Sequence, residues 1–269
     1  MTRTQPAASA KRTAEAKPAR SFADGDLILI AGLGNPGASY AGHRHNVGFM
    51  TLDRIARDKD FPGWRSRFQG EVAEGRIGAK RVVLLKPMTY MNESGRSVAE
   101  AARFYKIPAK DIIVIHDELD LAPGRCRVKI GGGHAGHNGL RSIHAHLGPD
   151  HARVRIGIGH PGHKSAVTGH VLRDFSKIEL ELIEPVLDGI VDGVEKLVAG
   201  DDAGFLNAVA LRTKPPSNAD RKSAAAGKKS PHQARAASRS AGDARRKADE
   251  ALADKPKNPL AQLLARFSR

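Results

Sequence analysis

Side chains that bind or move protons stand in five short turns of this chain, most of them directly after an apolar run. His45 is a candidate general base. Asp117 follows the apolar run at 112–115, and its carboxylate could orient an imidazole and stabilise its charged form. Three asparagines offer amides that both donate and accept hydrogen bonds: Asn35, Asn92 and Asn138. No serine or cysteine stands out as a nucleophile, so the pattern predicts direct attack by water on an activated acyl group.

The position of His45 bears on its protonation. It directly precedes an amphipathic stretch, 47–56, which predicts a helix. The positive end of that helix disfavours an imidazolium, so we expect a neutral base at His45. Ser94 belongs to the start of another predicted helix rather than to a catalytic set.

The elements that must position these residues alternate between strands and helices, which is typical of an α/β protein. Strands are predicted at 26–31, 68–77, 80–86, 111–116, 126–130 and 153–159, and helices at about 46–58, 92–106, 138–147 and 177–199. The strands at 68–77 and 80–86 read as a hairpin, so the sheet should be mixed. We therefore expect a single-domain, three-layer sandwich with a twisted mixed sheet between helices. Loops at the carboxyl ends of parallel strands gather at one edge, which would bring the five turns together.

Two motifs have alternative interpretations. Residues 32–37 match G-x-G-x-x-G, but no helix starts there, and Asp53 lies inside a predicted helix rather than at a strand end. The motif favours a tight loop that presents Asn35 over a nucleotide site. His134 and His137, with His116 and Asp117, suggest a metal site, but the pair lies in a glycine run without a clear third ligand. We expect no metal and no cofactor.

The charge of the chain is unevenly distributed. The 269 residues carry a net charge of +15. Residues 1–24 are expected to be a disordered basic extension, and residues 212–269 a basic, mostly disordered tail with a short amphipathic helix at 259–267. The globular part, 25–211, holds 24 Lys and Arg against 22 Asp and Glu and is nearly neutral. The tail, with 15 cations against 5 acids, could bind nucleic acid non-specifically.

The compartment is constrained by cysteine use and hydropathy. Cys126 is the single cysteine, which excludes an intrachain disulfide and fits a reducing compartment. No apolar stretch approaches the length of a membrane span, and the N-terminus lacks the apolar core of a secretory signal. We expect a cytoplasmic protein with no membrane association. The acid-poor, basic N-terminus leaves an organelle transit peptide as the alternative.

Cations concentrate between 123 and 164, where seven Lys and Arg face one acid. Lys129, Arg153 and Arg155 lie on or beside predicted strands, and alternation places Arg153 and Arg155 on the same face. The simplest interpretation is that these cations only face solvent. The neighbouring turn at 156–162 instead favours a phosphate-binding surface near the site.

In the turns that hold these candidate residues, the chain resembles bacterial peptidyl-tRNA hydrolase. The resemblance runs from about 27 to 211 and rests on separate blocks at 32–37 with Tyr40, 44–46, 90–92, 116–121, 131–140 and 155–162. It implies a single phosphorylase/hydrolase-like α/β domain. It also implies metal-free hydrolysis of the ester between a peptide, or an N-blocked aminoacyl group, and the 3′ ribose of tRNA. That activity recycles tRNA from prematurely released peptidyl-tRNA.

The resemblance also implies a role for each residue by its position. His45 would take a proton from water, and Asp117 would orient it and raise its basicity. Asn35 would position the water or the peptide, and Asn92 would donate to the ester carbonyl as it becomes an oxyanion. The remaining positions would contact substrate: Asn138 and His137 the peptide or terminal adenosine, Tyr40 and Met91 the cleft, and Lys129 and Arg155 the acceptor-stem phosphates.

The sequence leaves two rival functions open. One is a catalytically silent RNA-binding protein on the same fold, which would not need the set formed by His45, Asp117, Asn35 and Asn92. The other is a general carboxylesterase, which would not depend on Lys129 or Arg155. We expect the protein to act as a monomer, with peptidyl-tRNA as its partner through the acceptor stem and 3′ end.

Overall fold

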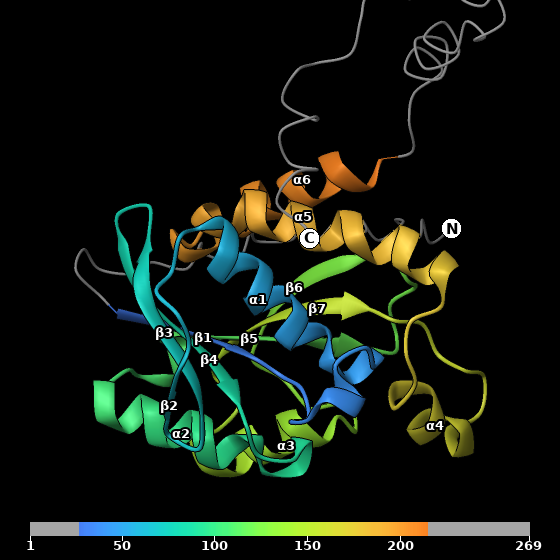
Figure 1. Cartoon of the computed structure of the whole chain (residues 1–269), viewed down its shortest axis with the longest axis horizontal. Coiled ribbons are helices and arrows are strands. Elements are labelled where there is room, and N and C mark those ends of the chain that lie inside the picture. Colours follow the sequence, from blue (N-terminus) through green and yellow to red (C-terminus); the bar gives the residue numbers. More distant parts are fainter. Residues whose placement is uncertain (1–26, 215–269) are drawn as a thin grey trace, which may run out of the picture. The chain divides into compact units, whose positions relative to one another are not determined.

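The computed structural model describes residues 27–214, and all structural statements concern this part of the chain. A mixed sheet forms its centre, with strand order β2-β3-β4-β1-β5-β7-β6 (Figure 1). The strands are β1 Leu27–Gly32, β2 Arg65–Arg67, β3 Gly70–Ile77, β4 Lys80–Pro87, β5 Ile112–Glu118, β6 Cys126–Ile130 and β7 Ala152–Gly157.

The centre of the sheet is parallel and its two sides are antiparallel. Strands β4, β1, β5 and β7 run parallel, while β2 and β3 at one side and β6 at the other run antiparallel to their neighbours. Parallel strands covered on both faces read as continuous apolar runs, and β5 is buried along its whole length. The chain leaves β1, β4 and β5 at one edge of the sheet, where the functional turns lie.

Helices cover both faces of the sheet. In Figure 1, α1, α5 and α6 lie above the sheet, and α2 and α3 lie below it. The α-helices are α1 Val47–Asp58, α2 Ser94–Tyr105, α3 Asn138–Leu147, α4 Val167–Val171, α5 Lys177–Val198 and α6 Asp202–Thr213. Short 3-10 helices are η1 Ala38–Tyr40, η2 Arg44–Asn46, η3 Met91–Glu93, η4 Ala109–Asp111 and η5 Lys164–Ala166.

The alternation of strand side chains divides the apolar core into two layers. Along β1, Ile28 and Ile30 pack into the layer beneath α1 and α5, whereas Leu29 and Ala31 pack into the layer with α2 and α3. The predicted three-layer sandwich with a mixed sheet is therefore confirmed. None of the helices within residues 27–214 has the length and apolarity needed to span a membrane.

Among the strands and α-helices, the prediction missed three. β2 consists of three exposed residues, Arg-Ser-Arg, without an apolar alternation that would mark a strand. α4 has five residues and buries only Val171. α6 buries only Phe205 and Val209, and it extends to residue 213, past the domain limit predicted at 211. The predictions for 1–24, for the tail from residue 215 onward and for the helix at 259–267 lie outside the described residues.

Candidate active site

His45 lies in η2, directly before α1, and its side chain is buried. Two contacts hold this segment in place. The neighbouring Arg44 forms two hydrogen bonds with Glu179 of α5, at 2.9 and 2.6 Å. Gly48, in the first turn of α1, touches the backbone where β1 and β5 end; an added Cβ would lie 2.3 Å from the Leu33 nitrogen. The close approach of α1 to the sheet is what carries His45 to the end of β5.

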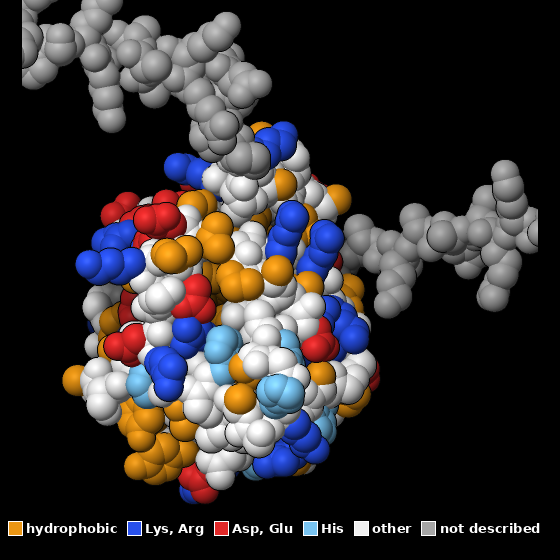
Figure 2. Space-filling model, turned by 90° about the vertical axis from the view of Figure 1, so that its right-hand side faces the viewer, with side chains coloured by type: hydrophobic (Ala, Val, Ile, Leu, Met, Phe, Trp, Pro, Cys, Tyr) orange, Lys and Arg blue, Asp and Glu red, His pale blue; other side chains and the backbone are white. Residues whose placement is uncertain are grey.

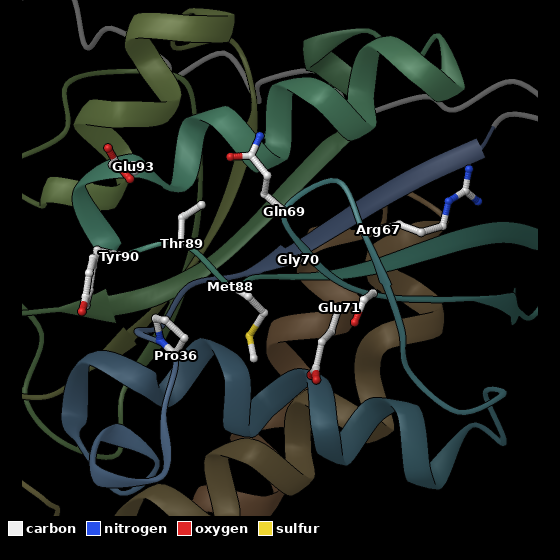
Figure 3. Close-up of a pocket in the computed structure, with 10 residues that line it drawn as sticks. Pro36, Arg67, Gln69, Gly70, Glu71, Met88, Thr89, Tyr90 and Glu93 are labelled. Atoms are coloured by element: carbon white, nitrogen blue, oxygen red, sulfur yellow. The ribbon is translucent and has the colours of Figure 1, made fainter.

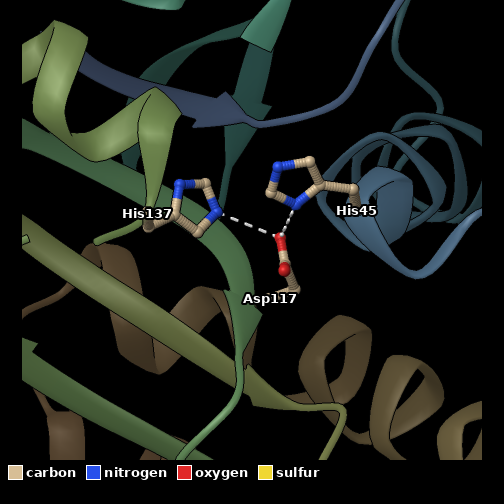
Figure 4. Close-up of side chains that lie close together, drawn as sticks. All are labelled: His45, Asp117 and His137. Carbon is tan, nitrogen blue, oxygen red and sulfur yellow. Dashed lines mark hydrogen bonds and ion pairs between the residues drawn. The ribbon is translucent and has the colours of Figure 1, made fainter. Parts of the chain in front are cut away.

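Asp117, near the end of β5, connects two imidazoles (Figure 4). Its Oδ1 lies 2.8 Å from Nδ1 of His45 and 3.0 Å from Nε2 of His137. The aspartate is only 3% exposed. A single buried carboxylate oxygen therefore orients a histidine from η2 and a histidine from the loop before α3.

The hydrogen bonds determine which nitrogen of each ring carries a proton. The His137 ring caps α3, because its Nδ1 accepts from the backbone N–H groups of Gly139 and Leu140 at 3.1 and 3.4 Å. Nε2 of His137 must then carry the proton and donate to Asp117. His45 likewise donates from Nδ1 to the carboxylate. This leaves Nε2 of His45 unprotonated, with its lone pair available as a base in the cleft that the residue lines.

The electrostatics favour an ionised aspartate and a basic His45. Burial by itself raises the pKa of Asp117, but the charges and hydrogen bonds of the two imidazoles hold it well below its usual range. Burial lowers the pKa of His45, yet the charge and hydrogen bond of Asp117 outweigh that effect and raise it overall. We expected the α1 terminus to lower the pKa of His45, and the net direction of that prediction was wrong. The full negative charge of Asp117 at hydrogen-bond distance exceeds the partial positive charge at the start of α1.

Asn35 is held rigidly at the end of β1. Its Oδ1 accepts from the Met91 backbone N–H at 2.8 Å, and its own backbone N–H donates to Oδ1 of Asn46 at 3.0 Å. Nδ2 of Asn46 in turn donates to the Asn35 carbonyl at 2.9 Å. The oxygen of the Asn35 amide is thus engaged, and Nδ2 remains as its donor toward the cleft. Asn46, which is not among the predicted site residues, fixes this loop, and its only sequence signal is its place beside His45.

The predicted residues meet in one cleft of about 730 Å³. Figure 2 shows this face of the molecule, with histidine side chains gathered near its middle and Lys and Arg side chains around them. Asn92 and Asn138 are exposed, whereas Met91 is buried beneath the cleft. Eight of the ten predicted residues line it: Asn35, Tyr40, His45, Met91, Asn92, Asp117, His137 and Asn138.

The predicted cations lie outside this cleft. Lys129 is exposed on β6, and Arg155 on β7 forms an ion pair with Glu118 at 2.6 Å. Arg153 is buried, and its guanidinium donates to the carbonyls of Gly131 and Gly133. Arg153 therefore supports the glycine loop that carries His137, and its predicted place on a phosphate-binding surface was wrong.

One group among the described residues has the geometry to hold a metal ion, namely His45, Asp117 and His137. The alternative grouping that the sequence suggested, His134 and His137 with His116 and Asp117, is not the one that forms. In the group that does form, both ring nitrogens facing the carboxylate act as hydrogen-bond donors to it, at 2.8 and 3.0 Å. A metal would have to replace both of those protons, so the donor set fits a hydrogen-bonded relay better than a metal site.

These features define a class of site: a carboxylate-oriented imidazole base in an amide-lined cleft, as in hydrolases that activate water directly. The comparisons with known proteins agree. The family model described as "Peptidyl-tRNA hydrolase" matches residues 29–217. The chain belongs to the peptidyl-tRNA hydrolase family.

Individual relatives cover most of the described chain. The peptidyl-tRNA hydrolase of Ruegeria pomeroyi is 57% identical over 190 residues, which is 71% of this chain and 80% of that protein. That of Paracoccus denitrificans is 55% identical over 207 residues, 77% of this chain and 88% of the relative. Among solved structures, peptidyl-tRNA hydrolase from Acinetobacter baumannii superposes with a TM-score of 0.65 at 45% identity, covering 68% of this chain and 94% of that one.

Proposed function

We propose that the protein hydrolyses the ester between a peptide, or an N-blocked amino acid, and the 3′ ribose of tRNA, and so recycles tRNA from prematurely released peptidyl-tRNA. Family membership supports the substrate class. The observation that carries the mechanism is the hydrogen bond between His45 and Asp117, which leaves Nε2 of His45 as a base in the cleft.

In the proposed reaction, Nε2 of His45 takes a proton from a water molecule as the water oxygen attacks the ester carbonyl. The carbonyl π electrons move to oxygen, and Asn92 donates a hydrogen bond to the resulting oxyanion. Collapse of this intermediate breaks the bond to the ribose oxygen, which receives the proton from the His45 imidazolium. The products are the free peptide acid and tRNA with its 3′ hydroxyl. Asp117 stabilises the transient imidazolium throughout.

The other cleft residues position the reactants. Nδ2 of Asn35 holds the water or the peptide carbonyl, and Tyr40 and Met91 shape the walls. Asn138, at the start of α3, contacts the peptide or the terminal adenosine. His137 acts beside it through the Asp117 oxygen that it shares with His45.

The magnitudes are sufficient for an activated ester. A general base contributes about 10²–10⁴-fold. A single oxyanion donor contributes about 10²–10³-fold. Together they require no covalent intermediate.

Outside the cleft, Lys129 and Arg155 hold acceptor-stem phosphates. Lys129 lies on β6 and Arg155 on β7, and in the strand order both strands lie to one side of β1 and β5, which position the catalytic residues. We place the protein in the cytoplasm and propose that it acts as a monomer, with its basic tail adding non-specific affinity for nucleic acid.

The test measures release of N-acetylated amino acid from charged tRNA in excess EDTA, beside hydrolysis of a small activated ester. Turnover of the tRNA substrate, unaffected by EDTA and far faster than that of the small ester, is the expected result. Binding of tRNA without turnover would instead identify a silent RNA-binding protein. Equal turnover of both esters would identify a general carboxylesterase, and loss of activity in EDTA would restore a metal to the mechanism.

A further inference from the structure

One buried histidine lies directly beside the catalytic residues without belonging to the cleft. His116 precedes Asp117 on β5 and is 1% exposed. It lines neither the catalytic cleft nor the groove of about 830 Å³ that shares Tyr90 with that cleft (Figure 3). Substrate therefore cannot touch His116, and any part that this residue plays in the reaction must act through its neighbours.

The alternation of side chains along β5 places His116 on the face of the sheet that α3 covers. Val114 packs into the layer with α2 and α3, and Ile115 packs into the layer with α1 and α5. By the same alternation, the side chain of His116 lies on the α3 face and that of Asp117 on the α1 face. His137, which caps α3, reaches across the end of β5 to bond Asp117, and His116 lies on the face from which it comes.

His116 contacts both of the residues that form this bond. Its Nδ1 lies 2.7 Å from the main-chain carbonyl oxygen of Asp117, so Nδ1 carries the proton and donates to that oxygen. Its ring lies edge-to-face against the ring of His137, with 4.9 Å between the centroids and 80° between the planes. One side chain therefore supports the main chain of the carboxylate and the imidazole that donates to it.

The cap of α3 alone does not fix the His137 ring. The cap holds the ring at Nδ1, and a ring held at one atom can still swing about that atom. The hydrogen bond from Nε2 to Asp117, at 3.0 Å, resists such a swing (Figure 4). The edge-to-face contact with His116 adds a second restraint, because it limits the plane in which the ring can lie.

Packing alone does not explain a histidine at this position. Nε2 of His116 is buried and has no hydrogen-bond partner among residues 27–214. A buried acceptor without a partner costs free energy that an apolar ring of the same shape would not cost. The apolar ring would, however, lack the donor at Nδ1. We therefore expect the histidine to serve the main chain of Asp117 as well as the core.

His116 also adds no positive charge beside the carboxylate. Burial, and after it the proximity of the His137 imidazole, hold the pKa of His116 well below its usual range. The charged or titratable groups around it are Asp117 on its own strand, His137 before α3 and Arg153 on β7. His116 is therefore neutral near pH 7, and it can act by position rather than by charge.

We propose that His116 is a positioning residue: its N–H fixes the main chain of Asp117 and its ring fixes His137, so that one carboxylate oxygen stays between the two imidazoles that donate to it. The proposal rests on the proposed function, because the carboxylate acts on the ester through His45. Without the His116 ring, the His137 ring turns away and Asp117 loses a donor that stabilises its negative charge. The carboxylate then stabilises the imidazolium of His45 more strongly, and the pKa of His45 rises.

Two substitutions separate the two contacts. His116→Asn removes the ring and keeps an N–H donor for the Asp117 carbonyl, whereas His116→Phe keeps a ring of similar size and removes the donor. His151→Asn is the matched control. His151 is also 1% exposed, and its Nε2 likewise has no partner within the described chain. It precedes the amino end of β7, however, at the opposite edge of the sheet from Asp117.

The measurements are kcat and KM on N-acetylaminoacyl-tRNA across pH, together with ¹⁵N-edited NMR of the ring N–H protons that donate to Asp117. His116→Asn should lower kcat by about 10–10²-fold with little change in KM, as expected for a misplaced catalytic group. It should also move the acidic limb to higher pH and lose the His137 Nε2–H signal by exchange with water. His116→Phe should lower kcat but keep that signal and the acidic limb, and His151→Asn should change none of these.

The proposal is overturned if folded His116→Asn keeps the wild-type kcat and the His137 signal. Activity that falls equally at every pH, with the signal intact, also overturns it, because His116 would then serve folding alone. If this variant does not fold, the wild-type spectrum and His116→Phe decide: a His116 ring protonated at Nε2, or wild-type kcat in His116→Phe, overturns the proposal. Failure of wild type to hydrolyse the substrate contradicts the proposed function instead, and the NMR test of His116 still stands.

Discussion

Replacing Asp117 by asparagine tests how the carboxylate supports His45. An asparagine can face the histidines with either its oxygen or its NH₂ group. The proton on His137 Nε2 is fixed by the backbone N–H groups at the start of α3, so an acceptor must face that ring. The same oxygen faces His45. We therefore expect Asp117→Asn to keep the amide oxygen in place and to remove only the negative charge.

The magnitude follows from the loss of that charge. At an effective dielectric constant of about 20, a unit charge about 4 Å from the imidazolium contributes about 4 kcal/mol. The full effect would lower kcat by about 10³-fold. The amide retains a neutral hydrogen bond of about 1 kcal/mol, which reduces the expected loss to about 10²–10³-fold.

The assay is kcat and KM on N-acetylaminoacyl-tRNA as a function of pH. The reaction needs a neutral His45, so activity falls as pH drops below its pKa, and Asp117 raises that pKa. In Asp117→Asn the acidic limb should move to lower pH while kcat on the plateau falls. Asp120→Asn is the matched control, because it makes the same change at an exposed acid lining the same cleft. A plateau kcat within about threefold of wild type, or an unmoved acidic limb, would refute this account of the charge.

Three further predictions concern the fold and the tRNA surface. Gly48→Ala should unfold the domain or abolish activity, because the new Cβ would displace α1. The control, Gly169→Ala, places its Cβ with nothing within 4 Å and should be neutral or stabilising by up to about 1 kcal/mol. Urea unfolding measures the stability of both variants, and a stable, active Gly48→Ala would contradict the packing argument. Burial lowers the pKa of His151 to about 4, so its protonation opposes folding as pH falls below about 6.5. His151→Leu should therefore shrink the loss of unfolding free energy between pH 7 and pH 5 by about 2 kcal/mol, and an unchanged loss would reject this role. Lys129→Ala should raise KM and reduce the salt slope of tRNA binding by about 1, with little change in kcat, whereas Lys110→Ala, on η4 before the amino end of β5, should do neither.

The fold was predictable because its signals are local. Apolar runs such as 112–115 mark buried parallel strands, and the spacing in α5 marks one buried face. β2 was not predictable, since its pairing with β3 depends on the hairpin and not on its own exposed residues. α6 was missed because few of its residues are buried. It packs on α5 at glycine positions such as Gly189, where α5 has no side chain, so α6 needs only a short apolar pattern to make the contact.

The candidate site was predictable as a set of residues and less so as a network. The position of Asp117 follows from strand ends meeting at one edge, whereas the approach of His45 depends on the packing of α1 against the sheet at Gly48. That His137 would share the same Asp117 oxygen does not follow from sequence, because it depends on how the glycine loop places the ring at the start of α3. The burial of Arg153 depends likewise on the loop carbonyls that fold over it.

The central claim is that Nε2 of His45 is the base that activates water. Its most direct test is single-turnover hydrolysis of N-acetylaminoacyl-tRNA by wild type and His45→Ala, with tRNA binding measured in parallel. The account predicts that the mutant binds tRNA as wild type does and loses about 10²–10⁴-fold in the rate of ester cleavage. Cleavage at the wild-type rate by a mutant with intact tRNA binding would contradict it.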